Sequence, residues 1–269
     1  MALLPPEYFD CVAAIGTESD KSKRWVASAF FYGFPVGEPG YKTFLVSNRH
    51  VFEGFEAVWV RINAEASEPA KEFQLLLSAK DGSPNWFAHP NPDVDVAVVP
   101  VHFENLHVRG ARPKFFPGDK QAIRTAEMAD IGTTEGDFVF ILGFPLGLAG
   151  EERNFVIVRA GTIARVRDLL DGKANTFLLD ASVFPGNSGG PVILKPEAMT
   201  IMGTKVSNMP YVIGIVQGYL PYEDVAVSAQ TKRPRVIFQE NSGLAVVHPI
   251  DCIDETVRAN LEAIDALKD

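Results

Sequence analysis

Short runs of apolar, β-branched and aromatic residues, separated by Gly, Pro, Asn and Asp, make up most of the chain. Runs of this length and composition predict β-strands. Because helical patterns are rare between them, the sequence predicts an all-β barrel or sandwich rather than a parallel α/β sheet. The main strands are expected over residues 12–16, 25–32, 43–47, 57–62, 73–77 and 94–101, and then over 137–142, 154–160, 162–166, 176–180, 191–194, 211–216, 236–238 and 243–247.

The stretch from about residue 102 to residue 134 separates these two sets of strands and is more irregular. Residues 109–118 carry two Gly and two Pro among charged residues, which is typical of a connector. We therefore expect two all-β halves, over residues 1–115 and 116–269. A second long irregular segment, residues 221–235, is expected to form either a surface hairpin or a lid over a substrate site.

The C-terminal tail has a different pattern from the rest of the chain. Its apolar residues recur at steps of three and four, which predicts an amphipathic helix packed on the β body, with binding of a partner by this face as the alternative. Asp251 is expected to cap the start of this helix. The apolar face contains Ile253, Val257, Leu261, Ile264 and Leu267.

Composition narrows the class of protein. The net charge of −9 argues against a nucleic-acid or anionic-membrane binder, and no run of about 18 apolar residues predicts a membrane span. The first residues lack the basic and apolar regions of a signal peptide, so we expect a cytoplasmic protein unless a targeting segment has been removed.

Cys11 and Cys252 make no disulfide framework and are expected to be free. Together with the five scattered His, they do not have the spacing of zinc ligands. No metal or other cofactor is expected.

One stretch carries candidate chemistry: residues 184–191 read Phe-Pro-Gly-Asn-Ser-Gly-Gly-Pro. Glycines allow backbone conformations closed to other residues, and the prolines restrict the chain on either side. Ser188 in such a turn can present its hydroxyl and nearby N–H groups to one point, as a nucleophile beside an oxyanion hole requires. A plain Gly/Pro-rich turn between strands is the alternative.

A serine nucleophile needs a base, and a histidine base needs an orienting acid. His50 directly follows an apolar strand, where reactive side chains are held on a rigid frame. His89, His102 and His107 are expected to be solvated instead. Asp95 opens the apolar run 96–101, where a carboxylate is costly unless it is paired; Asp93 would face the same side of a strand and is the second candidate.

These residues resemble the chymotrypsin-fold, trypsin-like serine proteases. The segments Arg-His-Val at 49–51, Asp-Val-Ala-Val-Val at 95–99 and Gly-Asn-Ser-Gly-Gly-Pro at 186–191 occur in the order His, Asp, Ser. Gly-Phe-Pro-Leu-Gly at 143–147 and Gly-Leu-Ala-Val at 243–246 are similar to segments of the bacterial HtrA/Deg type. The resemblance implies two six-stranded antiparallel β-barrels, the second followed by the C-terminal α-helix, with the catalytic groups between the barrels.

The resemblance also implies the role of each residue. Ser188 attacks the scissile carbonyl, His50 transfers the proton, Asp95 orients His50, and the N–H groups of Gly186 and Ser188 form the oxyanion hole. Digestive members of the family have an Asp at the position of Asn187, where it pairs with a newly cut N-terminus. An amide cannot form that ion pair, so activation by N-terminal cleavage is not expected.

The specificity pocket follows from the same resemblance. Ser182 is expected at its base, and Gln217, Gly218 and Tyr219 along its wall. Because no acid stands at the base, a small or medium apolar P1 side chain is expected rather than Arg or Lys. HtrA enzymes usually carry a PDZ domain after the protease. Because one helix follows the second set of strands here, we expect such a domain either to be absent or to belong to another protein, which would then be a regulatory partner.

Two other functions fit parts of the sequence. A catalytically silent protease-like module would bind peptides without cleaving them. Gly-Asn-Ser-Gly-Gly at 186–190 also fits the G-x-S-x-G elbow of α/β-hydrolase esterases, with Asp224 and His248 following in the required order. That elbow needs a helix after the serine, whereas residues 191–194 predict a strand.

Overall fold

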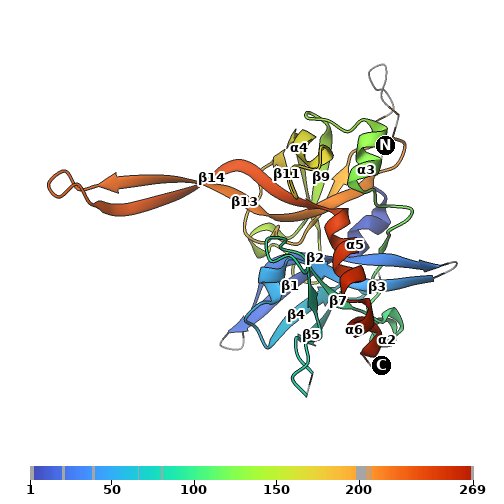
Figure 1. The fold of residues 1–269 in the computed structure, drawn as a ribbon. Coiled ribbons are helices and arrows are strands. Elements are labelled where there is room, and N and C mark those ends of the chain that lie inside the picture. Colours follow the sequence, from blue (N-terminus) through green and yellow to red (C-terminus); the bar gives the residue numbers. More distant parts are fainter. Residues whose placement is uncertain are drawn as a thin grey trace.

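The computed structural model describes residues 3–19, 22–37, 40–65, 67–79, 81–197, 205 and 207–267. Its strands form two sheets, one above the other in Figure 1, and the C-terminal helices run along one side of both. The predicted chymotrypsin-like, mostly β architecture with a C-terminal helix is confirmed. No helix in the described ranges is long and apolar enough to cross a membrane.

The first sheet has eight strands in the order β5-β4-β1-β2-β3-β7-β6, with β8 beside β2. Its pairs are antiparallel except for β2 and β8, which are parallel. The first half of β3 is partly exposed, and its second half is fully buried. The strands are β1 (Val12–Ser19), β2 (Ser22–Gly37), β3 (Gly40–Ser47), β4 (Ala57–Ile62), β5 (Lys71–Leu76), β6 (Phe87–Ala88), β7 (Ala97–Pro100) and β8 (Phe116–Pro117).

The second sheet is a closed six-stranded barrel in the order β10-β11-β14-β13-β12-β9. Closure leaves its strands no free edge within the barrel. Its interior is filled by aliphatic side chains of all six strands, which makes it a rigid frame for the loops at its rim. The strands are β9 (Phe138–Gly143), β10 (Ile157–Arg165), β11 (Phe177–Asp180), β12 (Pro191–Leu194), β13 (Tyr211–Val227) and β14 (Pro234–Pro249).

Short helices connect and flank the sheets. The 3-10 turns are η1 (Pro6–Cys11) and η2 (Pro145–Gly147), and the helices before the tail are α1 (Arg49–Phe52), α2 (Phe103–Val108), α3 (Thr125–Ile131) and α4 (Arg167–Leu170). The predicted C-terminal helix is present as two segments, α5 (Ile250–Ala259) and α6 (Leu261–Ala266).

The expectation that Asp251 caps its own helix is wrong. The capping position of α5 is Pro249, and Asp251 lies inside the first turn. Its carboxylate instead accepts hydrogen bonds from the backbone N–H and the hydroxyl of Thr125, each 2.8 Å long, at the start of α3. An acidic side chain satisfies a free N–H at a helix start whichever segment supplies it.

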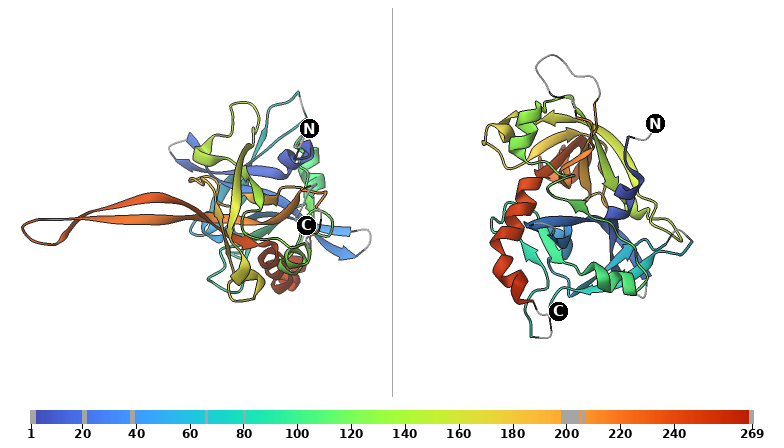
Figure 2. Two further views of the ribbon diagram at one scale, coloured as in Figure 1. Left: turned by 90° about the horizontal axis from the view of Figure 1, so that it is seen from above. Right: turned by 90° about the vertical axis from the view of Figure 1, so that its right-hand side faces the viewer.

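The largest apolar core joins the two halves. It includes Phe30 of the first sheet, Leu142 and Ile215 of the barrel, and Ile253 and Val257 of α5. Because α5 packs against both, it holds their relative position (Figure 2). The proposed division at residues 115 and 116 stays a prediction.

Beyond the barrel, β13 and β14 continue as a two-stranded ribbon. Pairing runs from Pro221–Asn241 to Val227–Pro234, so residues 221–235, which the sequence predicts to be a hairpin or a lid, belong to this hairpin. Figure 1 and the left view of Figure 2 both show this ribbon projecting far from the body of the molecule.

Candidate active site

His50 lies at the end of β3, in the first turn of the short helix α1. Its ring is half exposed, at 52%, while the Asp95 carboxylate behind it is only 16% exposed. Two hydrogen bonds join the residues: the backbone N–H of His50 donates to Asp95 Oδ1 at 3.0 Å, and His50 Nδ1 lies 2.6 Å from Asp95 Oδ2. This pairing leaves Nε2 of His50 on the open side of the ring.

The segment carrying Asp95 is fixed by two further contacts. Asn48 Nδ2 donates to the carbonyl oxygen of Asp95 at 2.8 Å, and the N–H of Asp95 donates to Nε2 of buried His248 at 3.2 Å. Asp93 is exposed, and its backbone N–H donates to Oδ1 of Asn91 at 3.0 Å. The structure therefore brings Asp95, and not Asp93, to His50.

The environment favours ionised Asp95 and neutral His248. Burial of Asp95 opposes its ionisation, but the side-chain and backbone hydrogen bonds of His50 outweigh burial and lower the pKa of Asp95. Burial lowers the pKa of His248, which is consistent with Nε2 acting as an acceptor. A negative charge is thus held beside Nδ1 of His50.

The loop that carries Ser188 depends on glycine at two positions. Gly186 and Gly189 have φ of +101° and +83°, in the region that favours glycine. A Cβ at Gly186 would collide with the carbonyl oxygen of Phe144, and one at Gly189 with the carbonyl oxygen of Ser28. The loop therefore packs directly on the backbone of both halves of the molecule.

Ser28, a fully buried residue of β2, fixes this loop from the first sheet. Its hydroxyl donates to the carbonyl oxygen of Gly186 at 2.7 Å and accepts from the N–H of Phe144 at 2.9 Å. Its own N–H donates to the carbonyl oxygen of Ser188 at 2.8 Å. Sequence reasoning did not identify Ser28, because an isolated serine in an apolar strand carries no motif.

The loop leaves two N–H groups available. The carbonyl oxygen of Pro185 accepts from the N–H of Leu146 at 2.7 Å, which fixes the peptide unit preceding Gly186. Within the described residues, neither the N–H of Gly186 nor that of Ser188 donates a hydrogen bond to the protein. Both donors are therefore free to bind an oxygen atom of a ligand.

Asn187 is fully buried, and its side chain folds back on its own loop. Its Oδ1 accepts from the N–H of Phe184 at 3.1 Å, and its N–H donates to the carbonyl oxygen of Phe184 at 3.0 Å. Nδ2 has no hydrogen-bond partner in the part of the chain that is described. The amide thus supports the loop locally.

Ser188 itself is partly exposed. The loop around it touches the end of β3, because a Cβ at Gly189 would also meet Oγ of Ser47, three residues before His50. Among the described residues no hydrogen bond joins Ser188 Oγ to His50. Such bonds are often long in unliganded enzymes and shorten only when substrate binds.

The residues expected to form the specificity pocket come from two segments. Ser182 is exposed, whereas Gln217, Gly218 and Tyr219 are half-buried in β13. Pairing with β14 shifts between Val216 and Gly218, so Gln217 is an extra residue in its strand. No acidic side chain is among the four.

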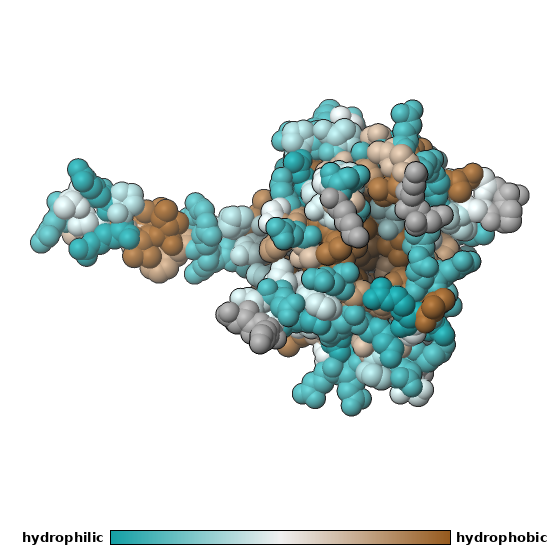
Figure 3. Space-filling model, turned by 90° about the horizontal axis from the view of Figure 1, so that it is seen from below, coloured by the Kyte–Doolittle hydropathy of each residue, from teal (hydrophilic) through white to brown (hydrophobic). Residues whose placement is uncertain are grey.

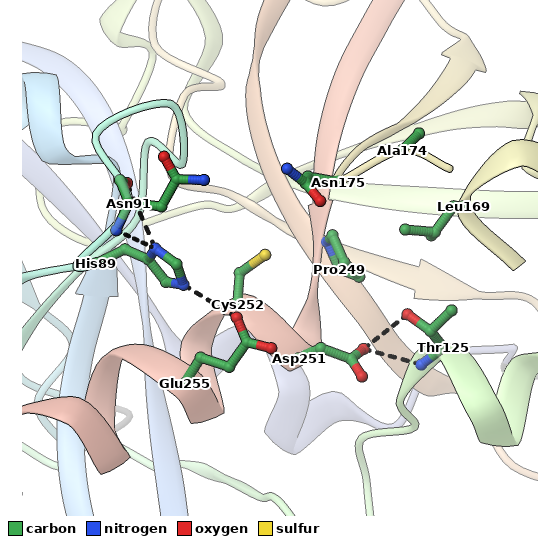
Figure 4. Close-up of a pocket in the computed structure, with 10 residues that line it drawn as sticks. All are labelled: His89, Asn91, Thr125, Leu169, Ala174, Asn175, Pro249, Asp251, Cys252 and Glu255. Carbon is green, nitrogen blue, oxygen red and sulfur yellow. Dashed lines mark hydrogen bonds and ion pairs between the residues drawn. The ribbon is translucent and has the colours of Figure 1, made fainter. Parts of the chain in front are cut away.

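A separate cavity of about 230 Å³ lies beside α5 and does not include His50 or Ser188 (Figure 4). His89 is at its wall, with Nε2 3.0 Å from Oε2 of Glu255. The expectation that His89 is solvated is wrong, because its side chain is only 6% exposed.

Over the described ranges no cluster of three or more His, Cys, Asp or Glu could hold a metal ion. Cys11 and Cys252 are free and buried, as expected.

The esterase alternative is wrong. Residues after Ser188 form the strand β12 and not a helix, and the surrounding sheet is an antiparallel barrel. His248 lies against the backbone of Asp95, and Asp224 stands on the projecting hairpin.

Comparison with known families agrees with this arrangement. The sequence matches the family described as trypsin-like peptidase domain over residues 28–197, more than half of the chain. The chain belongs to the trypsin-like peptidase family. The matched region includes His50, Asp95 and Ser188 of this trypsin-like peptidase domain, together with Ser28 at its first position. No curated protein sequence matches the chain.

Two solved structures resemble this trypsin-like peptidase domain. One is the apo form of the MamO protease domain from Magnetospirillum magneticum, at 14% identity and a TM-score of 0.48, covering 98% of this chain and 99% of that one. The other is the inactive form of the Rv3671c protease, at 15% identity and a TM-score of 0.48, covering 94% and 92%.

Proposed function

We propose that the protein is a serine endopeptidase that cleaves polypeptides through Ser188, His50 and Asp95. The observation that carries the proposal is the paired hydrogen bonding of His50 to a largely buried, ionised Asp95. A carboxylate in this position selects the tautomer with a proton on Nδ1 and leaves Nε2 able to accept one. The free N–H groups beside Ser188 support the same function.

The reaction follows from these positions. His50 Nε2 takes the proton of Ser188 Oγ as the oxygen attacks the scissile carbonyl, and the resulting oxyanion accepts hydrogen bonds from the N–H groups of Gly186 and Ser188. His50 then gives its proton to the leaving amine. Water, deprotonated by the same histidine, hydrolyses the acyl-enzyme and releases Ser188.

A fluorophosphonate probe tests the nucleophile directly, because it reacts only with an activated serine. We expect covalent labelling of the wild-type protein and complete loss of labelling in Ser188→Ala. The variant Ser67→Ala, at an exposed serine in the loop between β4 and β5, should label like wild type. Equal labelling of Ser188→Ala and wild type would refute the assignment.

We propose the substrate preference from the family resemblance, which assigns Ser182 to the base of the specificity pocket. If Ser182, which is not an acid, forms the base of the pocket, a peptide library should be cleaved mainly after small or medium apolar residues. A cleavage profile dominated by Arg and Lys would contradict this proposal while leaving the nucleophile assignment intact.

A peptide-binding module without activity is the second candidate. It is favoured by one observation, the lack of a hydrogen bond between Ser188 Oγ and His50 in the described structure. If this candidate holds, no probe labelling occurs under any condition, while peptides still bind and protect the Ser188 loop from hydrogen exchange.

A further inference from the structure

The projecting hairpin exposes more apolar surface than a two-stranded ribbon can bury by itself. Its side chains alternate between two faces that both meet solvent, so no core covers them. An exposed apolar ribbon whose outer edges are unpaired is normally covered by a partner or protected by charges. The exposed apolar residues are Tyr222 (57%), Val225 (42%), Val227 (57%), Val236 (48%), Ile237 (59%) and Phe238 (52%).

Charged residues gather toward the two ends of the ribbon, and the apolar pair Val225 and Ile237 lies between them and forms the apolar middle. Three acids stand at its root, where the ribbon leaves the barrel: Glu223, Asp224 and Glu240. Three bases stand at its tip: Lys232, Arg233 and Arg235. Figure 3 shows the resulting order along the ribbon, with a hydrophobic zone between two hydrophilic ones.

The tip is a closed turn and not a loose end. The N–H of Ser228 donates to the carbonyl oxygen of Arg233 at 3.0 Å, and the N–H of Lys232 donates to the carbonyl oxygen of Ser228 at 2.8 Å. The basic residues are therefore held at a defined distance from the acids. At about 3.3 Å per residue, five ladder positions between the centres of the two groups correspond to roughly 17 Å.

This order of charges is self-complementary. If a second hairpin is laid alongside in the opposite direction, each basic tip meets an acidic root and the two apolar middles coincide, near Val225 and Ile237. The same two ribbons laid in one direction would oppose like charges. Because the six charges cancel, pairing of the ribbons adds no net repulsion.

We propose that the hairpin is a dimerisation element that pairs antiparallel with the hairpin of a second copy of this chain. A two-fold pair of this kind is isologous, so one patch serves both subunits. The ribbon from residue 222 to residue 240 supplies 19 residues, slightly fewer than the roughly 20–30 residues a side of a standard interface. A reversible dimer in the micromolar range is therefore expected.

Sedimentation velocity over about 1–200 μM covers this range. We expect the wild-type mass to rise from one chain to two with concentration, and the dissociation constant to rise at high salt because the charge pairs are screened. Ile237→Asp should raise the dissociation constant at least about tenfold. Val108→Asp, at an apolar residue that is 87% exposed on α2, is the matched control and should dimerise like wild type.

Charge reversal tests the antiparallel arrangement. Replacing all three bases by Glu should abolish the dimer, and so should replacing all three acids by Lys. Combining both sets in one chain restores opposite charges at every contact and keeps the net charge at −9, so the dimer should return. Circular dichroism and thermal unfolding of each variant establish that the body remains folded.

A wild-type protein that stays monomeric over the whole concentration range would overturn the proposal, and would indicate that the hairpin serves another partner or none. A dimer that survives both single charge reversals, or fails to return in the combined variant, would overturn the antiparallel arrangement. These outcomes do not depend on whether Ser188 is reactive.

Discussion

At the scale of single residues, Ser28 holds the loop of the proposed nucleophile in place without taking part in the proposed reaction. Its hydroxyl links Gly186 to Phe144, and its backbone links to Ser188. Substitution by Ala leaves a buried carbonyl and a buried N–H without partners, at a cost of about 1–3 kcal/mol for each group.

For Ser28→Ala we therefore expect kcat to fall about 10- to 100-fold with KM nearly unchanged, because the loop that binds the oxyanion loses its fixed position. Steady-state kinetics on a peptide substrate separates the two constants. Ser67→Ala serves as the control. A rise in KM with unchanged kcat would mean that Ser28 does not position the oxyanion-binding loop.

Asp95 acts on His50 through the 2.6 Å contact at Nδ1. The amide of Asp95→Asn retains the shape but removes the charge and favours the wrong tautomer, so kcat should fall about 10³- to 10⁴-fold. The matched variant Asp93→Asn changes an exposed side chain two residues away and should retain full activity. The reverse outcome would restore Asp93 as the triad acid.

The sequence marks the three residues that carry the proposed reaction, but not the buried residues that hold them in position. Ser188, His50 and Asp95 stand in local patterns: a Gly/Pro-rich turn, the end of an apolar strand and the start of another. Ser28 and His248 act on partners 158 and 153 residues away, and nothing beside them in the sequence marks that distance.

At the scale of elements, α5 holds the two halves together through a buried ion pair. Asp254 is 1% exposed, accepts from Arg124 Nη2 at 2.9 Å and from the hydroxyl of Tyr32 at 2.8 Å. Burial raises the pKa of Tyr32, so its hydroxyl keeps the proton that it donates. These three residues come from α5, the connector and β2.

Asp254→Asn removes the buried carboxylate beside Arg124 and leaves this partly buried charge with only the exposed carboxylate of Glu127, 3.8 Å away. We expect the free energy of unfolding to fall by about 3–5 kcal/mol, measured by denaturant unfolding at neutral pH. Asp265→Asn, which removes the exposed pair with Lys42, should have little effect. Equal free energies of unfolding for the two variants would mean that the buried network of Asp254 does not stabilise the packing of α5.

Helical periodicity predicted that the tail would pack on the body, and this is correct because its apolar face meets the main core. Periodicity could not show what the acids on that helix contact. Asp251 and Asp254 bind residues near position 125 and in β2, and only the folded arrangement brings those segments to α5.

At the scale of the whole molecule, the contact between the halves includes the bond from the N–H of Asp95 to Nε2 of His248. His248 is fully buried in β14, and burial lowers the pKa of its ring. The strand patterns predicted two β halves, but not which side chains would join them, because such contacts depend on how two separately formed sheets meet.

The lowered pKa of His248 makes stability depend on pH. In the unfolded chain a histidine titrates near pH 6.5. Since the folded state disfavours the protonated ring, the stabilising contribution of neutral His248 is complete above about pH 6.5 and is lost as pH falls toward its lower folded pKa. Protonation also removes the acceptor for the N–H of Asp95.

We therefore expect the free energy of unfolding of the wild-type protein to decrease between pH 7 and pH 5. The slope should exceed that of His248→Gln by up to about 1.4 kcal/mol per pH unit, the limit for one proton. Glutamine can accept the same hydrogen bond but does not titrate. His107→Gln, at an exposed histidine of α2, is the matched substitution control. Equal slopes for wild type and His248→Gln would show that the buried ring does not couple protonation to the joining of the two halves.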